Sequence, residues 1–119
     1  MLQSIRMESR STLRVSTESG GSWDDPSEDH LFMLLEDIER GNELFLIVEQ
    51  LSDASGQTFI QTIRNEDGSY RVERRDGSPA EHYVTAAPDM RDAHALITSW
   101  AFGVAASADV EWTFLQLDA

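Results

Sequence analysis

Two stretches of the chain repeat apolar residues with the period of an α-helix. In the first, the apolar positions fall at i, i+3, i+4 and i+7, namely Leu31, Leu34, Leu35 and Ile38. The residues just before them favour a helix start, with Asp25 as the N-cap, Pro26 in the first helical position and Glu28 able to bond back to the cap. Gly41 suits the left-handed residue that often ends a helix. We therefore predict a helix over about residues 26–40.

The second helical pattern runs from Asp89 to about Phe102. Its apolar face comprises Met90, Ala93, Leu96, Ile97, Trp100 and Ala101. Asp89 suits the N-cap, Asp92 adds negative charge to the first turn, and Gly103 can end the helix.

Six shorter segments have the pattern of β-strands. They are Leu13–Thr17, Leu44–Val48, Phe59–Arg64, Tyr70–Arg74, His82–Thr85 and Val110–Leu115. The second of these is apolar throughout and predicts a central, two-sided strand. Residues 65–68 and 76–79 contain glycine and predict turns, whereas residues 19–22 are typical of a flexible connection.

The order of these elements is strand, helix, four strands, helix, strand. It predicts an α+β fold: a two-layer domain in which an antiparallel meander of five to six strands packs against two helices. The 119 residues fit one domain, residues 1–119, and residues 1–10, which show no period, are expected to be partly disordered.

The charge of the chain says more about its function than its overall composition does. The chain has 22 acidic residues, nine arginines and no lysine, and its formal net charge is −13. Between residues 18 and 53 there are eleven acidic residues and one cation, Arg40, a net charge of −10. Such a surface repels nucleic acid and anionic membranes and attracts basic proteins. The absence of cysteine and of an apolar leader leads us to expect a cytoplasmic protein.

No motif in the sequence predicts catalysis. His30, His82 and His94 lack the spacing of metal ligands, and we expect them to be solvated or packed without a chemical role. The sequence contains neither a GxSxG nor a GxGxxG motif. The basic cluster Arg71, Arg74 and Arg75 is expected to pair with Glu66, Glu73 or Asp76. We therefore predict a protein that is not an enzyme and needs no cofactor or metal.

The second half of the chain combines two glycine turns, at residues 66–70 and 75–79, with the strand His82-Tyr83-Val84, the helix from Asp89, and a closing Val110-Glu111-Trp112. In this order it resembles the Imm1-like class of bacterial immunity proteins. The resemblance implies a small cytosolic antidote that binds a toxin domain, often a nuclease or nucleobase deaminase, and blocks its active site. It supplies no catalytic residues.

Charge and resemblance together predict an immunity-type inhibitor with a basic protein partner. The expected partner-binding residues are Trp23, Asp24, Asp25, Glu28, Asp29, Glu36 and Glu39. The helical period places Glu36 and Glu39 on the solvent side, and Glu28 and Asp29 near the boundary.

Two alternatives remain open at this point. One is a module that associates with itself, as a homodimer, through exposed sheet edges. The other is a small enzyme or ligand-binding sheet with a pocket between helix and sheet that includes His82, Tyr83 and His94.

Overall fold

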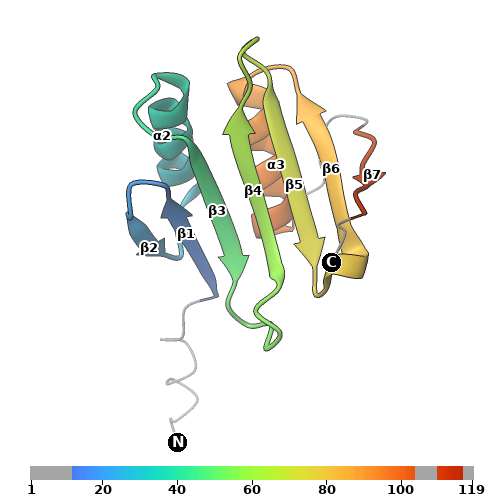
Figure 1. Ribbon diagram of the computed structural model, residues 1–119. Coiled ribbons are helices and arrows are strands. Elements are labelled where there is room, and N and C mark those ends of the chain that lie inside the picture. The colour runs from blue at the N-terminus through green and yellow to red at the C-terminus, as the bar shows by residue number, and fades with distance from the viewer. Residues whose placement is uncertain (1–11, 104–109, 117–119) are drawn as a thin grey trace, which may run out of the picture.

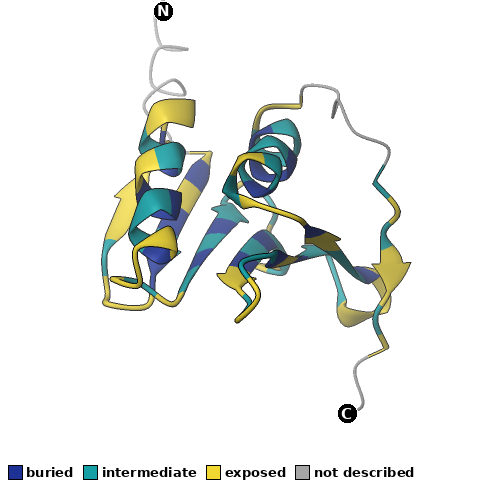
Figure 2. Ribbon diagram, turned by 90° about the horizontal axis from the view of Figure 1, so that it is seen from above, coloured by how far each residue is buried: buried dark blue, intermediate teal, exposed yellow. Residues whose placement is uncertain are grey.

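The computed structural model describes residues 12–103 and 110–116. It has two layers: a seven-stranded antiparallel sheet and two helices that both lie on one face of it (Figure 1; Figure 2). The predicted α+β class is confirmed. The prediction for residues 1–10 falls outside the described residues.

The strands lie in the order β2-β1-β3-β4-β5-β6-β7. From β3 to β7, each strand pairs with the next strand in the sequence. Their bounds are β1 Leu13–Thr17, β2 Ser22–Asp24, β3 Phe45–Gln50, β4 Thr58–Arg64, β5 Tyr70–Asp76, β6 His82–Ala87 and β7 Thr113–Phe114. A short 3₁₀ helix, Pro79–Glu81, connects β5 to β6. The predicted meander is present, with one strand more than the five to six expected.

The additional strand is β2, which begins at Ser22, the last residue of the predicted flexible connection, and continues through Trp23 and Asp24. Gly20, at φ +102°, makes the tight turn that brings residues 22–24 back alongside β1. All three β2 residues are exposed, so the strand has no apolar period that its sequence could reveal. At the opposite edge, β7 has only two residues, instead of the six predicted over Val110–Leu115.

Helix α2, Glu28–Glu39, begins later than predicted. Its N-cap is Ser27, whose side chain accepts a hydrogen bond from the His30 N–H at 3.0 Å. The prediction of Asp25 as the N-cap is therefore wrong. The Asp25 carboxylate instead accepts hydrogen bonds from the N–H groups of Thr12 and Leu13 at 2.9 and 3.0 Å, with the residue at φ +50°. These bonds hold the pKa of Asp25 below its ordinary range.

Helix α3, Met90–Phe102, agrees with the prediction at both ends. The Asp89 side chain accepts from the Asp92 N–H at 2.9 Å, and Gly103 closes the helix at φ +72°. A left-handed residue at this position favours glycine because it has no Cβ.

The core lies between the helices and one face of the sheet. Helix α2 packs over β3 and β4, and α3 packs over β4, β5 and β6. The buried apolar residues of the helices are Leu31, Leu34, Leu35, Ile38, Ala93, Leu96 and Ile97; those of the sheet are Leu13, Val15, Leu46, Val48, Ile60, Tyr70, Val72 and Ala87. The strand β3 is central, as predicted, but the helices cover only one of its two faces (Figure 2).

A stacked arginine joins β7 to the rest of the sheet. The Arg74 guanidinium carbon lies 5.1 Å from the centre of the Tyr83 ring and 4.7 Å from that of Trp112. Its Nε lies 3.5 Å from the Asp76 carboxylate, and this buried atom forms no hydrogen bond within the described part of the chain. Cation–π attraction to two rings therefore holds Trp112 against the sheet.

Candidate functional site

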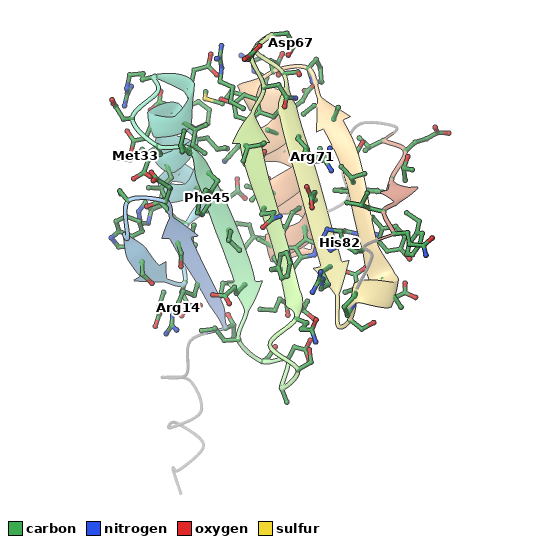
Figure 3. The ribbon with its side chains drawn as sticks, in the orientation of Figure 1. Arg14, Met33, Phe45, Asp67, Arg71 and His82 are labelled. Carbon is green, nitrogen blue, oxygen red and sulfur yellow. The ribbon has the colours of Figure 1, made fainter. Side chains whose placement is uncertain are left out.

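The helix-free side of the sheet is the first candidate surface. Because residues alternate between the faces of a strand, those of β3, β4 and β5 that do not enter the core point to this side. The strand register arranges them in three rows: Phe45, Ile63 and Arg71; Ile47, Gln61 and Glu73; and Glu49, Phe59 and Arg75. We call these nine residues the open face. In Figure 3, Phe45 and Arg71 lie over the side of the sheet that is turned away from α3.

A buried histidine lies at the border of the open face and is held there by two of its residues. His82 is 2% exposed. Its Nδ1 lies 3.1 Å from the Nε of Arg75, and its Nε2 lies 2.8 Å from a carboxylate oxygen of Glu73. An arginine Nε can only donate, so Nδ1 must accept, and Nε2 carries the proton that is donated to Glu73. The network thus defines a single tautomer of His82.

Glu73 is the centre of this network. One of its oxygens accepts from His82, and the other accepts from the Arg71 Nε at 2.7 Å. Burial opposes ionisation of the carboxylate, but the hydrogen bonds from Arg71 and His82 outweigh it and hold the pKa of Glu73 below its ordinary value of 4.5. Glu73 is therefore an ionised, paired carboxylate at neutral pH.

The open face is shallowly hollowed. A hollow of about 210 Å³ lies over the first two of these rows, and an adjoining hollow of about 260 Å³ lies over Ile47, Phe59 and Gln61. Both are smaller than the pockets of about 300–1,000 Å³ that enclose a small molecule. A third hollow, of about 400 Å³, lies beside Arg71 over Val84, Ala86 and Thr113. All three are open to solvent rather than enclosed, so this surface is better suited to contact another macromolecule than to enclose a substrate.

The outward side of α2 is the second candidate surface. Glu28, Asp29 and Met33 are exposed and Glu36 is half-exposed; we call these four residues the acidic ridge. Its three carboxylates form no ion pair with any other described residue. Met33 shares one side of the helix with Asp29 and Glu36, which are four residues before it and three after it, and is 59% exposed. The prediction that Glu28 and Asp29 lie near the boundary is wrong: both are more exposed than Glu36.

Trp23 lies beside the acidic ridge, on the edge strand β2. Its side chain is 40% exposed, and its ring centre lies 5.2 Å from that of His30 in an edge-on contact. The ring also covers Gly21, where an added Cβ would approach it to 2.3 Å. The absence of a side chain at Gly21 therefore leaves room for the partly exposed indole.

Three of the predicted partner-binding carboxylates have structural contacts. Asp24 pairs with Arg14 at 2.7 Å, and Asp25 binds the start of β1 as described above. Glu39 accepts a hydrogen bond from the Tyr70 hydroxyl at 2.6 Å, and the Nε of Arg64 is 3.4 Å from the same oxygen. Of the seven, Trp23, Glu28, Asp29 and Glu36 have side chains that form no ion pair or hydrogen bond with any other described residue.

The bond between Tyr70 and Glu39 leads to a testable expectation. Tyr70 is fully buried, and burial together with the carboxylate raises the pKa of its hydroxyl above the ordinary value of 10.0. Changing Tyr70→Phe should lower the free energy of unfolding by about 1 kcal/mol, because a hydrogen bond to a charged acceptor is lost while Glu39 can be rehydrated. Urea denaturation measures this loss. Glu39→Gln, which still offers an acceptor, should cost less; equal stability of Tyr70→Phe and the native chain would contradict the role of this bond.

The ligand pocket of the enzyme alternative, between helix and sheet, is not formed by the three residues that would line it. His82 lies in the network at the open face, while Tyr83, its neighbour in the strand, points to the other side and stacks on Arg74. His94 lies on α3, where its ring meets Phe32 and the backbone oxygen of Glu28. In the described part of the chain, no group of His, Asp and Glu side chains is arranged to hold a metal ion.

The open face was not among the surfaces expected from the sequence. The expected pairing of the arginines with nearby acids is confirmed for Arg71 with Glu73 and Arg74 with Asp76, whereas Arg75 bonds to His82 and Gln57 instead. A signal for this face was available, because Arg71, Glu73 and Arg75 alternate along β5 and so share one side of the sheet. A second available signal was the number of helices, since two helices are too few to cover both faces of a wide sheet.

Within residues 12–103 and 110–116, no helix is long and apolar enough to span a membrane. No protein-family model matches the chain, no curated protein is detectably similar to it, and no solved structure matches it.

Proposed function

We propose that this protein is an immunity-type inhibitor, which neutralises a toxin domain by covering its basic, nucleic-acid-binding active site. The observation that carries the proposal is the acidic ridge together with Trp23. Its three carboxylates form no ion pair with another described residue, and Met33 and Trp23 add two exposed apolar side chains. The inhibitor acts by binding alone and uses no catalytic residue.

The two kinds of side chain have different tasks in such a complex. A domain that acts on nucleic acid presents arginines and lysines to the phosphates, and Glu28, Asp29 and Glu36 offer those cations another partner. Long-range attraction between the surfaces raises the association rate, while apolar anchors slow dissociation. Trp23 is suited to this second task because large, rigid aromatic residues dominate the binding energy of most interfaces. Met33 adds a flexible apolar contact that can adapt to the partner.

The partner is identified first, by capturing proteins from a lysate of the source cells and washing at low and at high salt. Binding alone does not test the proposal. The captured protein should be basic, should arrest growth when expressed alone, and should become harmless when it is expressed together with this chain. A partner that is not toxic would contradict the proposed function.

The surface is then tested by removing charge from the acidic ridge. The variant Asp29→Asn with Glu36→Gln should lower the association rate at low salt about tenfold and flatten its dependence on salt, because exposed charges are screened within about 10 Å at 0.1 M salt. Stopped-flow or surface-based kinetics measure both effects. The free energy of unfolding should change by less than about 1 kcal/mol, as expected for unpaired charges at a helix surface.

The matched control removes the same amount of charge elsewhere. Glu66→Gln with Glu111→Gln neutralises two exposed carboxylates that lie on the β4–β5 hairpin and just before β7. If the association rate falls equally in the control, only the net charge matters and the acidic ridge is not the binding surface. Glu39 is unsuitable for this test because its loss would also disturb Tyr70.

A further inference from the structure

The open face carries exposed apolar side chains that no other part of the described chain covers. Phe45, Ile47 and Phe59 are half-buried, and Ile63 is 41% exposed. These four residues belong to β3 and β4 and lie next to one another across the two strands. An apolar patch at the centre of a sheet is a common feature of surfaces that pack against another sheet.

Charge decides what kind of partner fits this face. The open face holds two carboxylates, Glu49 and Glu73, and two arginines, Arg71 and Arg75, so its formal charge is zero. The chain as a whole carries −13, and a second copy approaching the acidic ridge would be repelled. At the open face two copies can meet without that repulsion, whereas a strongly basic partner gains nothing from it.

The strand register also makes the open face complementary to itself. Glu49 on β3 and Arg75 on β5 lie in the same row, on either side of Phe59 on β4. A two-fold axis that runs parallel to β4 exchanges the positions of β3 and β5 between the two copies. It therefore places Glu49 of each copy opposite Arg75 of the other, which gives two ion pairs from one arrangement.

The row formed by Phe45, Ile63 and Arg71 supports the same orientation. The axis places Phe45 of one copy opposite Arg71 of the other, a pair suited to a cation–π contact. An axis perpendicular to the strands would instead place Arg71 opposite Arg75, and these like charges would repel each other. Of these two orientations, only the one parallel to β4 avoids placing like charges opposite each other.

From this we infer that two copies of the chain associate open face to open face about a two-fold axis parallel to β4, forming a four-layer dimer with the helices outside. Residues of β4, such as Ile63, then lie near the axis and pack against their own counterparts. The acidic ridges are on the outer layers, so the dimer leaves both of them free. The inference does not depend on the proposed function.

The mass of the protein in solution tests whether the dimer exists. Sedimentation velocity over a range of concentrations should show a shift from the 13.4 kDa of one chain to twice that mass. Ile63→Asp should abolish the shift, because it places two carboxylates against each other near the axis. Phe102→Asp is the matched control: Phe102 is 39% exposed, but it lies on α3, and its replacement should leave the dimer intact.

Charge reversal tests the orientation. Glu49→Arg and Arg75→Glu should each raise the dissociation constant of the dimer at least about tenfold. The double reversal should restore it, because the opposite charges again face each other. Arg75 also supports His82, so the fold of each variant is checked by circular dichroism, and a second measurement does not involve Arg75. In the cysteine-free chain, Ile63→Cys should be cross-linked by a short bis-maleimide, and Phe102→Cys should not.

Two results would overturn the inference. The first is a mass of one chain at every concentration up to about 1 mM, the range of the weakest specific associations. The second is a dimer that survives Ile63→Asp, which would show that the copies pair through another surface, such as the edge strands β2 or β7.

Discussion

Replacing His82 with alanine is expected to lower the free energy of unfolding by about 3 kcal/mol, the range observed when one partner of a buried polar network is removed. His82 is almost completely buried and joins Arg75 to Glu73 through both ring nitrogens. Its loss leaves Glu73, which is largely buried, with one donor fewer and opens a space beside the ring of Phe59. Urea denaturation at pH 7 should show a lower midpoint with an unchanged slope.

Two further variants separate packing from hydrogen bonding. His82→Phe fills the same space but offers neither nitrogen, and we expect it to lose about 2 kcal/mol, most of the effect. His94→Ala removes a partly exposed histidine with one hydrogen bond to a backbone oxygen and should cost less than about 1 kcal/mol. If His82→Phe is as stable as the native chain, the imidazole acts only by filling space and the network contributes nothing.

The second large effect concerns Glu73, whose contribution depends on pH. At pH 7, Glu73→Gln should lower the free energy of unfolding by about 2 kcal/mol, because an amide can accept from His82 or from Arg71 but turns its NH₂ group toward the other donor. The pKa of Glu73 is lower in the folded protein than its ordinary value of 4.5, so its stabilising effect is complete above that value. As the pH falls through the lowered pKa, the carboxylate becomes protonated and the effect disappears.

The measurement is the difference in stability between the native chain and Glu73→Gln, followed from pH 7 down to the acid limit of folding. This difference in the free energy of unfolding should be constant near neutral pH and should decrease toward zero as the pH falls below about 4.5. Other carboxylates with lowered pKa values, such as Asp25, titrate in both proteins and cancel in the difference. Glu66→Gln removes an exposed carboxylate that forms no ion pair with any described residue, and at pH 7 it should change the free energy of unfolding by less than about 0.5 kcal/mol. A gap between the native chain and Glu73→Gln that persists unchanged at low pH would contradict the role given to ionised Glu73.

Local patterns in the sequence predicted the elements that depend on near neighbours. The second helix, its cap at Asp89 and its end at Gly103 all depend on contacts within one turn, and these were predicted correctly. The hairpin between β4 and β5 likewise follows from alternation and a glycine turn. The start of α2 was placed wrongly because Asp25 and Ser27 both suit an N-cap, and Asp25 is engaged instead by residues 12 and 13. That choice depends on β1, which no local pattern near residue 25 contains.

The candidate surfaces show the same division between local and distant contacts. The concentration of negative charge between residues 18 and 53 can be counted in the sequence, and it indicates the kind of partner the protein would attract. The sequence does not show which carboxylates are unpaired, because a partner can be distant in sequence: Glu39 is bonded to a residue 31 positions away. The network of His82 and Glu73 likewise joins two strands, and its burial depends on their pairing.

The sequence by itself determined the fold class, the apolar faces of both helices and the excess of acidic residues, since each arises from periodicity or from composition. Only the tertiary structure decided that both helices lie on one side of the sheet, which leaves the open face uncovered and brings Glu49 and Arg75 into one row. The physical reason is that exposure and ion pairing depend on where segments distant in sequence pack against one another, and this packing depends on the whole chain.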